Sequence, residues 1–153
     1  MPTASITIST AGPGTAPEEI EAALRRPGDP AGHGPDVVAV TETTDGNTRW
    51  ELTFRGTPLR WTQHDTATPG GGEFVQVEGD FAALSGSWSV DGAAVRFAFT
   101  FRTSVAHLAG AVDPMVARVL LRSALARVAG ACGGEVAVLE GAEQLRDRLP
   151  THA

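Results

Sequence analysis

The sequence contains no lysine, no tyrosine and a single cysteine, and each absence excludes a class of chemistry. All 12 basic residues are arginines, so Schiff-base catalysis by lysine and acid catalysis by tyrosine are both impossible. The lone Cys132 excludes an internal disulfide and a cysteine-cluster metal site, and it favours a reducing, cytoplasmic location. The abundance of Ala, Gly, Pro and Arg is typical of a GC-rich genome, so we expect an actinobacterial source.

Long apolar runs and a positive charge excess are also missing. Every apolar stretch is interrupted well before the ~18 residues that a membrane span requires. Residues 1–14 lack the basic start and apolar core of a signal peptide. The formal net charge of -6 argues against a nucleic-acid partner. With 153 residues, of which 42% are hydrophobic, the chain is expected to form one globular domain.

The periodicity of apolar residues changes twice along the chain. A short strand is predicted at 4–10 and a short helix at 15–26. Between 36 and 103 the period is two, with tight turns that predict an antiparallel meander with one apolar face. A long amphipathic helix is predicted to begin at Asp113-Pro114. We expect one domain over 1–134, followed by a short C-terminal extension over 135–153.

A sheet with one apolar face needs a cover, and the C-terminal helix is the only long helix with an apolar face. The sequence therefore predicts an α+β helix-grip fold. In this fold a curved antiparallel sheet of six to seven strands wraps around a long C-terminal helix. Such an arrangement encloses a cavity wherever side chains fail to fill it, which favours small-molecule binding.

The middle of the chain also resembles a known family. Between about 37 and 130 it is similar to the START-like (SRPBCC / Bet v 1-like) superfamily, and more narrowly to its bacterial polyketide cyclase/dehydratase branch. The residues that support the resemblance are Leu59-Arg60-Trp61-Thr62-Gln63-His64-Asp65, Val77-Glu78-Gly79-Asp80-Phe81, Leu84, Gly86, Trp88, Val95-Arg96-Phe97 and Phe99.

The resemblance implies a hydrophobic ligand in the cavity. Natural-product members fold poly-β-ketone chains and catalyse aldol cyclisation and dehydration without a cofactor. It further implies a substrate that an acyl carrier protein can present, and it leaves a homodimer open. Related aromatase/cyclases often carry an inward Arg on the strand that holds Trp61 and an Asn on the long helix. The matching positions here are Asp65 and Ala124, so the usual cationic group is missing from its strand.

Four polar side chains are the candidates for chemistry. If Trp61 points inward, period two sends Gln63 and Asp65 inward as well. If Phe74 points inward, Gln76 and Glu78 follow on the neighbouring strand. We interpret Asp65 and Glu78 as acid–base residues and the two glutamines as ligands for substrate carbonyls. Two alternatives stay open: these residues lie at solvated strand ends, or the register is inverted.

The remaining candidates are a histidine and an aromatic wall. His107 precedes the long helix and could shuttle protons at the cavity mouth, although a lone loop histidine is more often a surface residue. Trp50, Trp61, Trp88 and Phe99 would form the wall, or simply the core if no pocket exists. The four histidines are scattered and predict no metal site.

Three functions are compatible with this pattern. The first is a polyketide cyclase-like enzyme that promotes cyclisation, with or without dehydration, by shape and acid–base residues. The second is a non-catalytic carrier of hydrophobic, lipid- or quinone-like ligands. The third is an interaction domain with a filled core. A pocket with polar groups inside favours the first, an all-apolar pocket the second, and no pocket the third.

Overall fold

The computed structural model describes residues 2–12, 15–26, 36–43, 45–54, 56–103, 109–133 and 136–145. It contains eight strands and three helices within these ranges. Their bounds are β1 Thr3–Ser9, α1 Pro17–Leu24, β2 Val37–Glu42, β3 Asn47–Phe54, β4 Thr57–Thr68, β5 Gly71–Gly79, β6 Phe81–Asp91, β7 Ala94–Thr103, α2 Ala109–Cys132, β8 Ala137–Glu140 and α3 Ala142–Leu145.

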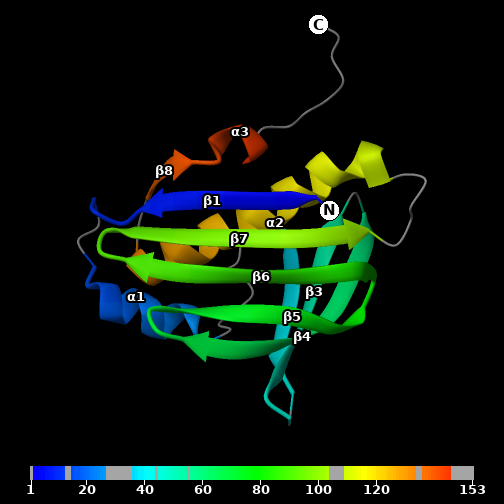
Figure 1. Cartoon of the computed structure of the whole chain (residues 1–153), viewed down its shortest axis with the longest axis horizontal. Helices are drawn as coiled ribbons and strands as arrows, with labels where there is room; N and C mark the ends of the chain where they lie inside the picture. Colours follow the sequence, from blue (N-terminus) through cyan, green and yellow to red (C-terminus); the bar gives the residue numbers. More distant parts are fainter. Residues whose placement is uncertain are drawn as a thin grey trace, which may run out of the picture.

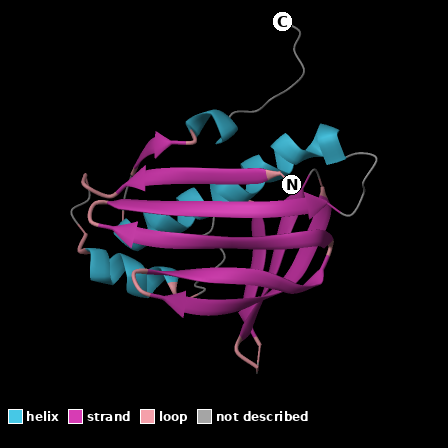
Figure 2. Cartoon of the chain, viewed as in Figure 1, coloured by secondary structure: helices cyan, strands magenta, loops and turns pink. Residues whose placement is uncertain are grey.

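All the strands belong to one antiparallel sheet with the order β2-β3-β4-β5-β6-β7-β1-β8. The sheet curves, so that β2 and β3 lie steeply across the direction of β1, β6 and β7 (Figure 1). The helix α2 crosses behind this curved sheet, and α1 lies beside it (Figure 2). The predicted helix-grip architecture is confirmed.

The described part of the sheet has eight strands rather than six to seven. The additional strand is β8, which forms this edge of the sheet and pairs with β1 through Ile8 and Val138. Next to it, the backbone N–H of Ser5 donates to Oε1 of Gln144 at 3.2 Å. Residues 137–145, predicted as part of an extension, therefore continue the sheet and its flanking layer.

The core lies between the sheet and α2. Alternate residues of β1 and β7 are buried on the side that faces the helix, as the period-two pattern predicts, and β6 adds Phe81, Leu84 and Trp88 to the core. The helix contributes apolar side chains at helical spacing. The largest fully buried residues are Phe97, Phe101, Ile6, Ile8, Ile20, Leu52, Leu121, Val95, Val116 and Val128.

The long helix begins earlier than the sequence predicts. It starts at Ala109, so Pro114 lies inside the helix instead of at its first turn. Proline has no N–H, so the carbonyl of Gly110 loses its helical hydrogen bond. Among the described residues, no helix combines the length and apolarity that crossing a membrane requires.

Candidate functional site

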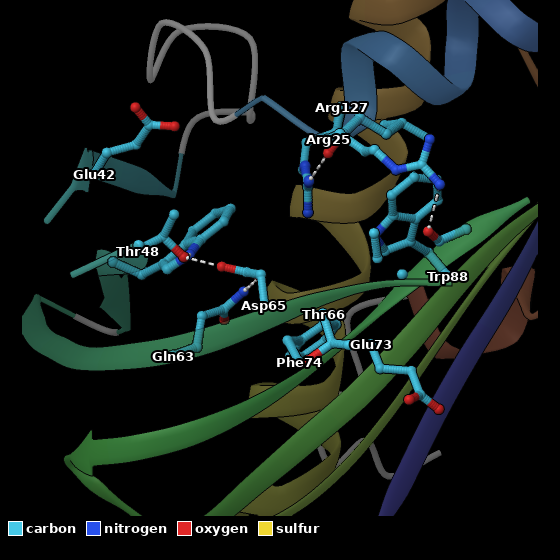
Figure 3. A pocket seen from close by; sticks show the side chains of 16 residues that line it. Arg25, Glu42, Thr48, Gln63, Asp65, Thr66, Glu73, Phe74, Trp88 and Arg127 are labelled. Carbon is cyan, nitrogen blue, oxygen red and sulfur yellow. Dashed lines mark hydrogen bonds between the residues drawn. The ribbon is translucent and has the colours of Figure 1, made fainter. Parts of the chain in front are cut away.

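A cleft of about 240 Å³ opens at the rim of the sheet, and we call it the mouth cavity. It lies between the C-terminal end of α1, strands β2 to β6 and one arginine of α2 (Figure 3). Its lining residues are Leu24, Arg25, Glu42, Gly46, Thr48, Trp50, Gln63, Asp65, Thr66, Ala67, Gly71, Gly72, Glu73, Phe74, Trp88 and Arg127. The lining combines aromatic rings with charges of both signs.

A smaller space of about 20 Å³ lies further inside, and we call it the inner chamber. A space of this size holds about one water molecule. The predicted interior cavity is therefore almost filled by side chains. Its lining residues are Trp50, Leu52, Trp61, Gln63, Phe74, Phe99, Leu120, Ser123, Ala124 and Arg127.

Asp65 on β4 is the end point of two hydrogen-bond chains. In the first, the Trp61 indole donates to Oε1 of Gln63 at 2.9 Å, and Nε2 of Gln63 donates to Oδ1 of Asp65 at 2.7 Å. In the second, the Trp50 indole donates to Oγ1 of Thr48 at 3.1 Å, and this hydroxyl donates to Oδ2 of Asp65 at 2.8 Å. Both chains therefore deliver a donor to the Asp65 carboxyl group.

These chains exist because an indole N–H can only donate. Each indole requires an acceptor, so Gln63 and Thr48 must turn their remaining donor toward Asp65. The two indole rings also stack, with centroids 5.9 Å apart and planes 2° from parallel. The network fixes the aromatic wall and the carboxyl group as one unit. The Asp65 side chain remains exposed and lines the mouth cavity.

Arg127 reaches the cavity from α2, on the side opposite the sheet (Figure 3). Its guanidinium lies 5.3 Å from the ring centroid of Trp50 and 5.3 Å from that of Phe97. It donates from Nη2 to the carbonyl of Leu24, at the C-terminal end of α1, at 2.9 Å. A cation is favourable there because helix carbonyls carry partial negative charge.

Burial lowers the pKa of Arg127 to about 10, and the charge of Asp65 opposes this shift. The guanidinium therefore still carries its charge near neutral pH. The site thus holds a cation from the helix and a carboxyl group from the sheet that act on each other across one cavity. Water is partly excluded from this cation, which strengthens its pull on a carbonyl oxygen.

Arg25 fixes α1 over the mouth cavity. It donates from Nη2 to the carbonyls of Thr68 and Gly71, at 2.9 Å and 3.0 Å, beside the β4–β5 turn. It also pairs with Glu21 of the same helix. Its guanidinium lies 5.8 Å from the ring centroid of Trp88. The Arg25 guanidinium is therefore already bound to other groups of the protein.

The described residues contain no group of three or more His, Cys, Asp or Glu side chains that could hold a metal ion. The acidic side chains that line the mouth cavity are Glu42, Asp65 and Glu73, and Arg25 and Arg127 line it with them. The chemistry that these residues offer is acid–base and electrostatic.

Sequence comparison decides the family of this chain. The profile of the family described as polyketide cyclase/dehydrase and lipid transport matches residues 34–128, which is more than half of the sequence. The chain belongs to this family. The predicted resemblance is confirmed at this level. No curated protein matches the sequence significantly.

Solved structures show the same fold at low sequence identity. TTHA0849 from Thermus thermophilus is 18% identical, with a TM-score of 0.66 over 86% of this chain and 97% of that chain. A START superfamily protein from Mycobacterium smegmatis is 10% identical, with a TM-score of 0.65 over 85% and 95% of the two chains. The Zhui aromatase/cyclase from Streptomyces sp. R1128 is 17% identical, with a TM-score of 0.56 over 86% and 90%.

Six of the site residues predicted from the sequence line the mouth cavity or the inner chamber. Trp50 and Gln63 border both the mouth cavity and the inner chamber. Asp65 and Trp88 line the mouth cavity alone. Trp61 and Phe99 line the inner chamber alone, and both are buried.

The predicted inward orientation of Glu78 is wrong, because the ladder between β4 and β5 contains a bulge. Gln63 pairs with Gln76, but the preceding residue, Thr62, pairs with Glu78. The extra residue, Val77, shifts the alternation, so Glu78 lies opposite Thr62 instead of following Gln76 on the face of Gln63, and it is exposed. Glu78 lines neither space.

Gln76 and His107 do not contribute to the site as described. The Gln76 amide donates to the carbonyl of Phe81 at 2.9 Å and accepts from its N–H at 3.3 Å, so it fastens the β5–β6 corner. Both ends of the Gln76 amide are therefore hydrogen-bonded to the backbone of Phe81, and Gln76 lines neither space. His107 lies outside the described residues.

Two residues of the site, Arg127 and Thr48, were not predicted from the sequence. A signal for Arg127 was present: it lies seven residues after Leu120 and three after Ala124, on the apolar stripe of the helix. A charged side chain on such a stripe is expected to face the interior, where it is a candidate for a functional residue. Thr48 had no comparable signal, since an inward threonine is common in strands.

Proposed function

We propose that the chain is a cyclase acting on a short poly-β-ketone-type substrate in the mouth cavity, with Arg127 and Asp65 as its polar centre. The observation that supports this proposal is a half-buried cation that faces a carboxyl group across an aromatic-lined cavity. An acyl carrier protein would present the substrate. The substrate would contact Trp50, Gln63 and Trp88.

The arrangement suits an aldol-type reaction. Asp65 would remove a proton from the carbon between two ketone groups, and Arg127 would stabilise the negative oxygen that develops. The resulting carbanion equivalent attacks a second carbonyl, forming the new C–C bond and an alkoxide that takes up a proton. Loss of water and enolisation of the remaining ring ketones would then give an aromatic ring. The aromatic wall holds the chain folded, which lowers the entropic barrier to ring closure.

The polar lining is the reason to prefer an enzyme over a carrier. A carrier for lipid-like molecules would be expected to offer an apolar pocket. Here Arg127 and Asp65 face a cavity whose lining also includes Trp50, Phe74 and Trp88. The two hydrogen-bond chains also orient a carboxyl group that a carrier would not need.

Asp65→Asn is expected to lower the cyclisation rate about 10²- to 10⁴-fold, the usual contribution of a general base. The amide cannot accept the proton, while its shape keeps most of the network. The measurement is the rate at which a linear poly-β-ketone N-acetylcysteamine thioester forms aromatic product, above the uncatalysed rate.

Glu78→Gln is the matched control, because it removes an exposed carboxylate that lies outside both spaces. Its rate should equal that of the wild-type protein. A wild-type protein that does not accelerate cyclisation, or equal rates in the Asp65 and Glu78 variants, would contradict the proposal.

Alkaline pH provides an independent test of Arg127. Since burial lowers its pKa to about 10, the guanidinium should lose its charge above about pH 10, and the affinity for a neutral aryl ketone should fall there. The chain contains no lysine or tyrosine to titrate in the same range. The measurement is ketone affinity from pH 7 to 11 by equilibrium dialysis.

Unfolding does not explain such a loss. The folded-state pKa of Arg127 lies below the ordinary value of an arginine, so between the two values the unfolded chain binds more protons. The contribution of this group to the free energy of unfolding therefore rises with pH in that window. Arg127→Met should show a weak affinity that does not change across the same range, and a pH-dependent affinity in this variant would refute the assignment.

A further inference from the structure

Four residues separate the mouth cavity from the inner chamber. Trp50, Gln63, Phe74 and Arg127 line both spaces, so they form the partition between them. Three of the four are held by polar contacts. Trp50 and Gln63 belong to the network that ends at Asp65, and Arg127 is bonded to the carbonyl of Leu24.

Phe74 on β5 is the apolar member of this partition. Its ring packs on Phe99 with centroids 5.6 Å apart and planes tilted by 57°. Beneath it lies Gly86, where an added Cβ would come within 2.4 Å of the Phe74 ring. A glycine at this point of β6 makes room for the ring. Phe74 therefore occupies a ring-sized volume between the two spaces.

We propose that Phe74 determines the size of the ligand, by closing the mouth cavity to the interior and limiting the bound part of the molecule to one or two fused rings. This inference rests on the proposed function, because it concerns the same cavity and the same ketone ligands. An engineered cavity of about 150 Å³ binds benzene. The mouth cavity, at about 240 Å³, is larger than this benzene-binding cavity but smaller than two of them together. A third ring would stay in solvent.

Three methyl aryl ketones with one, two and three fused rings test this directly: acetophenone, 2-acetylnaphthalene and 2-acetylanthracene. They share one carbonyl group and differ in apolar size. In the wild-type protein the affinity should rise about tenfold from one ring to two, the order expected for a few added buried carbons, and should not rise further for three. The measurement is equilibrium dialysis at about pH 7.

Phe74→Ala removes a ring from the partition and joins the chamber to the mouth cavity. The three-ring ketone should then bind about tenfold more tightly than the two-ring ketone, because its last ring occupies the vacated volume. Leu52→Ala is the matched control. Leu52 lines the inner chamber only, so its removal enlarges the chamber and leaves the partition in place. This variant should keep the wild-type order of affinities.

Circular dichroism and a urea denaturation curve establish that each variant is folded, and Phe74→Leu replaces Phe74→Ala if the latter is not. The expected result for Phe74→Leu is a smaller shift in the same direction. The inference is overturned if wild-type affinity keeps rising to three rings, if the Phe74 variants keep the wild-type order, or if Leu52→Ala changes it equally. If none of the three ketones binds the wild-type protein, the proposed function fails together with the inference.

Discussion

Arg127→Met is expected to weaken the binding of 2-acetylnaphthalene about 10- to 100-fold at about pH 7, since a hydrogen bond to a charged group contributes ~1.5–3 kcal/mol. Methionine keeps an unbranched apolar stem against Trp50 and Phe97 but has no donor for the ketone oxygen. The cyclisation rate should fall by at least as much, because the developing negative charge loses its counter-charge.

Arg122→Met is the control for this experiment. Arg122 lies on the same helix, pairs with Asp36 at 3.3 Å and lines neither space. Its removal should leave ketone affinity within about twofold of wild type, since a partly exposed ion pair contributes little. Equal losses in the two variants would mean that Arg127 acts through helix stability and not through the ligand.

The same substitution should loosen α1. The carbonyl of Leu24 loses its donor when Arg127 is removed, and the C-terminal end of the helix loses a nearby cation. Amide hydrogen exchange in residues 20–24 should therefore become faster in Arg127→Met than in Arg122→Met. Unchanged exchange would show that Arg25 alone holds the helix end.

Gly86→Ala is expected to lower the free energy of unfolding by about 3 kcal/mol, the upper part of the range for overpacking a core. The new Cβ would lie 2.4 Å from the carbonyl oxygen of Ala98 and 2.4 Å from the ring of Phe74. The first of these atoms belongs to the backbone of the neighbouring strand and cannot move without breaking the β6–β7 ladder. The measurement is urea denaturation followed by tryptophan fluorescence.

Gly12→Ala gives the baseline for this comparison. A Cβ at Gly12 would meet nothing within 4 Å, so the substitution should change the free energy of unfolding by less than about 1 kcal/mol. Phe74→Leu in the Gly86→Ala background should recover part of the loss, because it relieves one of the two contacts. A Gly86→Ala protein as stable as Gly12→Ala would show that the two strands separate easily at this point.

Much of the fold could be predicted from local pattern. Alternation in Trp50, Leu52 and Phe54, and again in Phe97, Phe99 and Phe101, assigns an inner face to each strand, and the observed burial of Leu52, Phe97 and Phe101 agrees. A sheet with one apolar face and a single long amphipathic helix leaves few architectures. The pattern is local, however, and extends only as far as the ladder remains regular.

The prediction that Glu78 points inward was wrong for this reason. Counting by two from Phe74 assumes an unbroken ladder, and one extra residue at Val77 reverses the face of everything after it. Nothing in Val75-Gln76-Val77 signals the bulge, because a bulge depends on how two strands meet. The turn at Pro69-Gly70 shows the opposite case, since its glycine has a φ of 75° that the sequence signal anticipates.

The sequence by itself determined one limit most clearly: without lysine, any permanently charged side-chain cation in the site had to be an arginine. The sequence also determined the helix-grip fold, the aromatic wall and the candidacy of Asp65, because these follow from residue type and short-range period. Only the tertiary structure placed Arg127 opposite Asp65 and Phe74 across the cavity. Those positions depend on how α2 lies over the curved sheet, and this packing joins residues that no local pattern connects.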